Sequence, residues 1–138
     1  MGVESLCIPH TQIREEGEAK ITEALRDRGV QLIFLAGYMR VLSSSFVRDW
    51  RNRIINIHPS LLPSFKGGHA VREALKFGVK VTGCSEEIDH GKIIAQSPVT
   101  IDEEDDEASL HAKIQEKEHQ LFPEVMQKLA KSITKSSL

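Results

Sequence analysis

The sequence has few of the features that mark secreted, membrane or nucleic-acid-binding proteins. Its two cysteines, Cys7 and Cys84, are too few and too far apart for a disulfide framework or a zinc site, so we interpret them as buried reduced thiols. Formal charge is nearly balanced at −2, and no basic stripe with interleaved aromatic residues is present. The longest apolar runs, residues 32–36 and 54–57, are too short to span a membrane, and no signal peptide pattern opens the sequence. These absences predict a cytoplasmic protein without nucleic-acid or membrane partners.

The pattern of apolar and polar residues alternates between strands and helices over a length suited to one domain. Helices are predicted for residues 14–28, from Ser43 or Ser44 to 50, for 71–78 and for 106–132, and Pro123 is expected to kink or break the last one. Strands are predicted for residues 30–35, 53–58, 79–83 and 92–101, with a further strand possible at 3–8 and a polar loop at 85–91. This alternation is typical of an α/β fold with a mostly parallel sheet.

Six consecutive acidic residues, 102–107, precede the last predicted helix. We interpret them as a solvated loop whose carboxylates stabilise the amino end of that helix. A metal site in this run is the minor alternative.

One strand and the loop after it carry the residues that suggest chemistry. Asn56 and His58 stand two positions apart in the predicted strand 53–58, so their side chains point to the same face. An amide donor beside an imidazole can polarise a carbonyl group and move a proton. In α/β sheets, ligands bind at the carboxyl ends of strands, where this pair and residues 37–40 both lie. The sequence therefore predicts a site for carbonyl chemistry there.

Three motifs together resemble one enzyme family. They are Leu35-Ala-Gly-Tyr-Met-Arg, Asn56-Ile-His58-Pro-Ser-Leu-Leu-Pro-Ser-Phe-Lys-Gly and Glu118-His119-Gln-Leu-Phe-Pro. The chain resembles glycinamide ribonucleotide formyltransferase (phosphoribosylglycinamide formyltransferase), the folate-dependent enzyme of purine synthesis. The resemblance implies a Rossmann-like formyltransferase sheet, incomplete on its amino-terminal side, in a single catalytic domain over residues 1–138 that lacks the family's first β-α-β portion.

The resemblance also implies a reaction and residues for it. The family transfers the formyl group of 10-formyltetrahydrofolate to the amine of phosphoribosylglycinamide, without a metal, in a monomer or homodimer. Its catalytic residues correspond to Asn56, His58 and Asp89. Its folate site corresponds to Arg14, Met39, Arg40, Val41, Leu42 and Asn56, and its ribonucleotide site to Gln115 and Glu118.

The sequence departs from the family pattern in two places. No counterpart of the family's glycine-serine-asparagine phosphate loop is present, and the run between Cys84 and Asp89 is shorter, without the usual apolar strand that carries a histidine. We therefore expect little or no transfer by this chain alone. The alternatives left open are a formyltetrahydrofolate hydrolase-like enzyme and an inactive folate-binding or structural remnant. The sequence also leaves open whether the chain has its natural start, results from a gene-model error or is part of a larger polypeptide.

Overall fold

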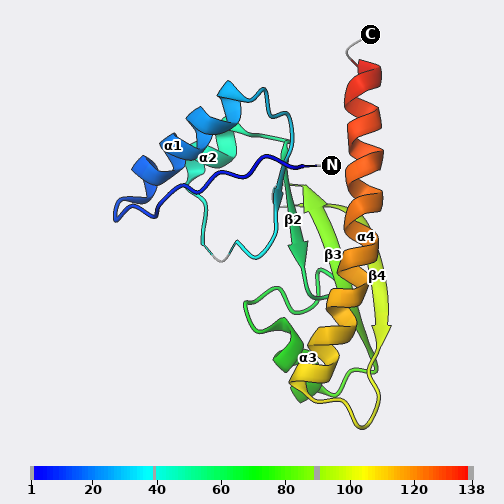
Figure 1. Cartoon of the computed structure of the whole chain (residues 1–138). Coiled ribbons are helices and arrows are strands. Elements are labelled where there is room, and N and C mark those ends of the chain that lie inside the picture. Colours follow the sequence, from blue (N-terminus) through cyan, green and yellow to red (C-terminus); the bar gives the residue numbers. More distant parts are fainter. Residues whose placement is uncertain (1, 39, 89–90, 137–138) are drawn as a thin grey trace. The chain divides into compact units, whose positions relative to one another are not determined.

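The computed structural model describes residues 2–38, 40–88 and 91–136, which form two compact units (Figure 1). The first unit ends at Ile54 and the second spans Ile55–Leu138. The single domain over residues 1–138 stays a prediction.

The first unit contains α1 (Arg14–Asp27), β1 (Ile33–Leu35) and α2 (Ser44–Asp49). The expected strand at residues 3–8 is absent, since residues 2–10 have no regular structure and most of their side chains are exposed. Cys7 in this stretch is exposed, so the expectation of a buried thiol is wrong for Cys7, whereas Cys84 is buried as expected. The backbone N–H of Ile33 donates to the carbonyl of Arg53 at 2.8 Å, which joins β1 to the residue before the next strand. The core of this unit is apolar and consists of Phe46, Trp50 and Ile54, with Ile21, Leu25, Ile33, Leu35, Leu42 and Val47 packed against them.

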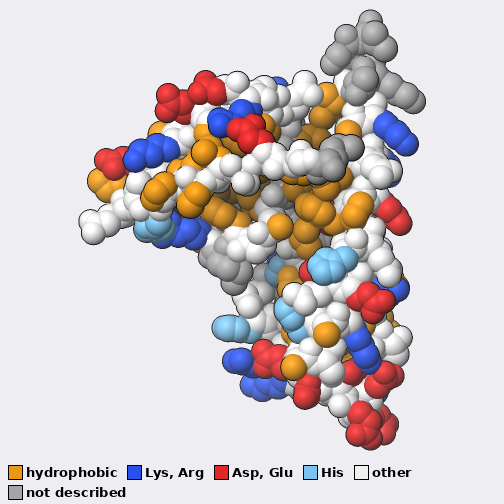
Figure 2. All heavy atoms as spheres, viewed as in Figure 1, with side chains coloured by type: hydrophobic (Ala, Val, Ile, Leu, Met, Phe, Trp, Pro, Cys, Tyr) orange, Lys and Arg blue, Asp and Glu red, His pale blue; other side chains and the backbone are white. Residues whose placement is uncertain are grey.

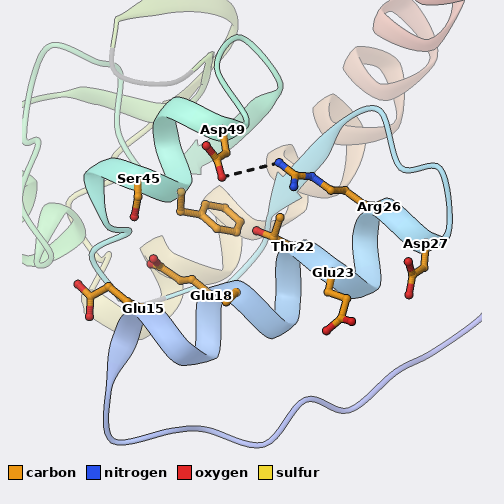
Figure 3. Close-up of a pocket in the computed structure, with 10 residues that line it drawn as sticks. Glu15, Glu18, Thr22, Glu23, Arg26, Asp27, Ser45 and Asp49 are labelled. Carbon is orange, nitrogen blue, oxygen red and sulfur yellow. Dashed lines mark ion pairs between the residues drawn. The ribbon is translucent and has the colours of Figure 1, made fainter.

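Ser43 organises the contact between the two helices of this unit. Its hydroxyl accepts the backbone N–H of Phe46, which confirms it as the cap of α2. The buried carboxylate of Glu18 on α1 accepts hydrogen bonds from both the N–H (2.9 Å) and the hydroxyl of Ser43. Figure 3 shows the neighbouring pocket of about 420 Å³ between α1 and α2, where Arg26 and Asp49 form an ion pair at 3.7 Å. These polar groups thus hold the helices together.

The second unit contains most of β2 (Ile54–His58), together with α3 (Ala70–Phe77), β3 (Val81–Ile88), β4 (Lys92–Thr100) and α4 (Glu107–Ser136). Strand β3 pairs antiparallel with β2 on one side and with β4 on the other. The α/β class is confirmed, but the expectation of a mostly parallel sheet is wrong for these pairings. For β3 and β4 the reason is chain length, because three residues separate them, whereas a parallel crossover needs about a dozen or more. The segment between β2 and β3 contains α3 and is long enough for a crossover, so chain length does not explain their antiparallel pairing.

Strand β3 is longer than predicted, because residues 85–88 continue the strand instead of forming a loop. Its backbone groups pair with β2 and β4 along this stretch, so polar side chains do not prevent strand formation there. The predicted end of α3 is confirmed: Gly78 adopts the left-handed conformation, with φ of 75°, that a glycine tolerates after a helix.

Helix α4 covers the sheet of the second unit by packing against β3 and β4 (Figure 1). The core between them is formed by Val71, Cys84, Val99, Leu110 and Ile114. The helix continues through Pro123, so of the predicted kink or break the break is wrong, and the kink stays a prediction. Leu121 packs against the core before the proline and Val125 is buried after it. Packing on both sides of Pro123 offsets the loss of the backbone hydrogen bond that a proline cannot donate.

The acidic run before α4 acts as a helix-capping loop, as predicted. The Asp106 carboxylate accepts the N–H of Ser109 at 2.8 Å, and the Ser109 hydroxyl accepts the N–H of Asp106 at 3.0 Å. Lys113 donates to Asp102 at 2.7 Å and to Asp105 at 2.6 Å. Hydrogen bonds from Lys113, from the backbone N–H of Asp102 and from Ser109 together lower the pKa of Asp105 to about 2. Figure 2 shows carboxylates gathered at the end of the molecule where this loop lies.

Candidate active site

The second unit contains a pocket of about 320 Å³ at the carboxyl end of β2. Its described lining residues come from β2, the loop that follows and the β3–β4 hairpin: Asn56, His58, Leu62, Pro63, Lys66, Glu87, Gly91 and Ile93. The structure therefore brings Asn56 and His58 into one pocket. Their catalytic roles stay predictions.

Alternation along β2 places these two side chains. Asn56 and His58 share one face of the strand, and burial decreases along it from the buried Ile54 and Ile55 to the half-buried residues 56–58. A buried neighbour anchors the strand, and the polar pair remains open to a ligand.

A hydrogen bond orients the ring of His58. Its Nε2 lies 2.8 Å from the carbonyl oxygen of Phe65. Because a carbonyl oxygen only accepts, Nε2 carries a hydrogen in this contact, which leaves Nδ1 to exchange a proton. Phe65 has φ of 50°, in the left-handed region that a non-glycine residue seldom adopts. The loop backbone thus aims its carbonyl at the imidazole.

The hydroxyl of Ser85, the residue paired with His58 across the strands, fixes the loop after β2. It donates to the carbonyl of Ser60 at 2.7 Å and accepts the backbone N–H of Leu62 at 2.9 Å. Gln96 on β4 donates to the Ser85 hydroxyl at 3.0 Å and to the carbonyl of Leu62 at 2.9 Å. These bonds connect the sheet to the loop and hold the pocket wall in place.

The residues expected to bind folate lie in the first unit, apart from Asn56. Arg14, at the start of α1, donates to the carbonyl of Val41 at 3.5 Å, so two of the predicted residues are brought together. Arg40 and Val41 are exposed, and Leu42 packs against the apolar core of that unit. Met39 and the expected catalytic Asp89 both lie outside the described residues.

The residues expected to bind the ribonucleotide are on α4. Gln115 is exposed and Glu118 is partly buried. Burial raises the pKa of the Glu118 carboxyl, and the nearby histidines His111, His119 and His58 oppose that rise. The pocket residues Lys66 and Glu87 were not among the predicted site residues. The signal for Glu87 in the sequence is the short run after Cys84, whose polar residues predict a loop.

A second carboxylate lies close to Glu118. Glu86 on β3 is 1% exposed, and neither of its carboxylate oxygens has a hydrogen-bond partner among the described residues. Burial, and then the charge of Glu118, raise the pKa of Glu86 to about 7. Within the described part of the chain, no group of three or more His, Cys, Asp or Glu side chains is placed to hold a metal ion. None of the helices described is both long and apolar enough to cross a membrane.

Comparison with known proteins identifies the family. The formyl transferase family matches residues 3–126. The trifunctional purine biosynthetic protein adenosine-3 of Drosophila melanogaster is 46% identical over 132 residues, which cover 91% of this chain and 10% of that protein. Phosphoribosylglycinamide formyltransferase of Bacillus subtilis (strain 168) is 44% identical over 117 residues, which cover 81% of this chain and 60% of that enzyme.

Solved structures agree with this assignment. The crystal structure of phosphoribosylglycinamide formyltransferase from Anaplasma phagocytophilum superposes with a TM-score of 0.79 at 44% identity, covering 83% of this chain and 58% of that one. A formyltetrahydrofolate deformylase from Pseudomonas syringae pv. tomato superposes at 0.73 with 28% identity, covering 80% of this chain and 39% of that one. The chain thus spans a tenth of the length of the Drosophila relative and three fifths of the Bacillus enzyme. On this evidence, the chain belongs to the formyl transferase family.

Proposed function

We propose that the chain serves the transfer of a formyl group from 10-formyltetrahydrofolate to the amine of phosphoribosylglycinamide in purine biosynthesis. The observation that carries the proposal is the joint placement of Asn56 and His58 in one pocket, in a chain 44% identical to an enzyme named for this reaction. The 28% identical deformylase is a more distant neighbour, which favours transfer to an amine over hydrolysis.

The chemistry follows from the groups in the pocket. As the amine nitrogen attacks the formyl carbon, the carbonyl π electrons move to oxygen and create a negative charge. The side-chain amide of Asn56 donates a hydrogen bond to that oxygen. His58 stabilises it as imidazolium or moves a proton, with Nε2 held by the Phe65 carbonyl. When the charge returns to carbon, the bond to folate N10 breaks and the formyl group stays on the substrate amine.

The remaining predicted residues complete the proposal. Arg14, Met39, Arg40, Val41 and Leu42 hold the formyl-folate, and Gln115 and Glu118 contact the ribonucleotide. Asp89 passes a proton to or from His58 through water. We further propose that the protein is cytoplasmic, which cell fractionation tests. We also propose that it is a monomer or homodimer, which light scattering after size-exclusion chromatography tests.

Replacing the oxyanion donor tests the proposed function. Loss of one such donor typically costs about 10²–10³ in kcat, so we expect a drop of that size in formyl transfer by Asn56→Ala. The matched control is Gln127→Ala, which removes an exposed amide on α4 and should leave transfer unchanged. Because little or no steady-state transfer is expected from this chain alone, transfer is measured in a single turnover at high chain concentration, where one slow transfer per chain is detected.

Two results would contradict the proposal. Formate release from 10-formyltetrahydrofolate that does not depend on the amine would indicate a hydrolase. Folate binding with no transfer at all would indicate a binding remnant. Both are measured in the same reaction mixture by following formate and formylated amine together.

A further inference from the structure

One side chain of β4 holds the loop that follows β2. The side-chain nitrogen of Gln96 donates to the carbonyl of Leu62 at 2.9 Å and to the hydroxyl of Ser85 at 3.0 Å. An amide nitrogen carries two hydrogens, so both are used in these contacts. Gln96 itself is exposed, so its side chain has no part in the apolar core of the unit.

The register of the sheet puts Gln96 in one row with His58. Ser85 on β3 pairs with His58 on β2 on one side and with Gln96 on β4 on the other. Directly opposite residues on neighbouring strands share a face of the sheet. Gln96 therefore lies on the face of His58, although it is not among the described residues that line the pocket.

The hydroxyl of Ser85, in the middle of this row, makes every hydrogen bond that it can. It is fully buried, donates to the carbonyl of Ser60 at 2.7 Å and accepts the backbone N–H of Leu62 at 2.9 Å as well as the amide of Gln96. A hydroxyl has one hydrogen and two lone pairs, and these three contacts use them all. Loss of the Gln96 donor would thus remove one of the three bonds that fix a buried group.

A turn connects this part of the loop to His58. The backbone N–H of Ser64 donates to the carbonyl of Leu61 at 3.0 Å, and the Ser60 hydroxyl donates to the carbonyl of Ser64 at 2.5 Å. Phe65 follows directly, with φ of 50°, and its carbonyl accepts from Nε2 of His58 at 2.8 Å. A non-glycine residue keeps a left-handed conformation only where the surrounding structure fixes its backbone. The contact with His58 therefore depends on the order of this loop.

We propose that Gln96 is a positioning residue for His58. From outside the pocket its amide holds the loop in place, and the loop carries the Phe65 carbonyl that orients the imidazole. Gln96 needs no contact with a ligand for this role, because it acts through Ser85 and Leu62. The purpose of the positioning rests on the proposed function, since formyl transfer requires reacting groups held in a defined orientation.

A hydrogen-exchange experiment tests the positioning without turnover. Gln96→Met keeps nearly the length of the side chain and removes both donated hydrogen bonds. NMR of the isotope-labelled chain at one fixed pH measures how fast the Nε2 hydrogen of His58 exchanges with water. Loss of one hydrogen bond of typical net strength changes an equilibrium roughly fivefold, so we expect this exchange to be at least about fivefold faster in Gln96→Met. Equal exchange in the variant and the wild type would overturn the proposal.

Three controls separate positioning from a general loss of stability. Gln96→Lys returns a donor at the same position, and exchange at His58 as fast as in Gln96→Met would overturn the role of that donor. Gln127→Met removes an exposed amide on α4 and should leave the exchange unchanged. The backbone N–H of Ile101, which donates to the carbonyl of Lys80 at 2.9 Å in the same unit, is the internal reference. Equal acceleration at Ile101 and His58 in Gln96→Met would show that the substitution loosens the whole unit, which would also overturn the proposal.

The two proposals fail in different ways. If the wild-type chain transfers no formyl group in a single turnover, the proposed function is refuted, and the exchange experiment still decides whether Gln96 positions His58. If the wild type transfers, Gln96→Met should transfer several-fold more slowly, with a nearly unchanged Kd for 5-formyltetrahydrofolate, which carries no formyl group on N10 to transfer. Equal transfer rates in the two chains would refute the role of Gln96 and leave the proposed function intact.

Discussion

Replacing Glu86 by glutamine should stabilise the protein at neutral and alkaline pH. Glu86 is 1% exposed, and both of its carboxylate oxygens lack a hydrogen-bond partner among the described residues. Its pKa is raised from 4.5 to about 7, first by burial and then by the charge of Glu118. Glutamine keeps the size and shape of the side chain and removes only the charge.

The sign of the pH dependence follows from the raised pKa. Below 4.5 the carboxyl is protonated in both the folded and the unfolded chain, so it contributes no difference between them. Between 4.5 and about 7 the unfolded chain releases the proton while the folded chain keeps it, so the free energy of unfolding falls as pH rises. Above about 7 the whole penalty is present. A rise from 4.5 to about 7 corresponds to about 3 kcal/mol.

Urea denaturation followed by circular dichroism measures this effect. From about pH 4 to about pH 8, the wild type should lose up to about 3 kcal/mol of stability through Glu86. Glu86→Gln should lose much less, with the remaining slope in this range due partly to Glu118, whose pKa is also raised. The control is Glu124→Gln, an exposed carboxylate on α4, which should keep the wild-type pH dependence. Identical pH dependence in Glu86→Gln and the wild type would refute the reasoning.

Two further predictions concern the packing of the second unit. Ile114 is fully buried in its core, so Ile114→Ala should lower the free energy of unfolding by about 2–5 kcal/mol, whereas Met126→Ala, at a side chain 41% exposed, should cost well under that. Both are measured by urea denaturation, and equal costs would contradict the assigned core. A Cβ on Gly83 would lie 2.0 Å from the carbonyl oxygen of Ser97 and 2.9 Å from the Leu61 side chain, so Gly83→Ala must push β3 and β4 apart. We expect a loss of at least about 1–3 kcal/mol and a lower Tm, and Gly2→Ala, where a Cβ meets open space, is the control.

Local signals account for the elements that the sequence predicted well. Helix α1, the Ser43 cap of α2 and the glycine that ends α3 depend on residues close together in the chain. The common face of Asn56 and His58 is also a local property, because side chains two positions apart on a strand point to the same face whatever the strand pairs with. For these elements the sequence was sufficient.

The errors occurred where distant residues decide the structure. Residues 85–88 are polar enough to suggest a loop, but β2 and β4 lie on either side and pair with them. The proline in α4 suggests a kink or a break, and core contacts on both sides of it keep the helix from breaking. In both cases long-range packing overrides a local preference.

The amino-acid sequence by itself determined the family motifs, most of the helices and the strand that presents Asn56 and His58. Only the tertiary structure decided what the two adjacent glutamates do. The cross-strand register sends Glu87 into the pocket beside Asn56 and buries Glu86 without a partner on the opposite face. The physical reason is that the register depends on the pairing of strands that are distant in the sequence. Because successive side chains point to opposite faces of a strand, a shift of one position moves a side chain from the pocket to the core.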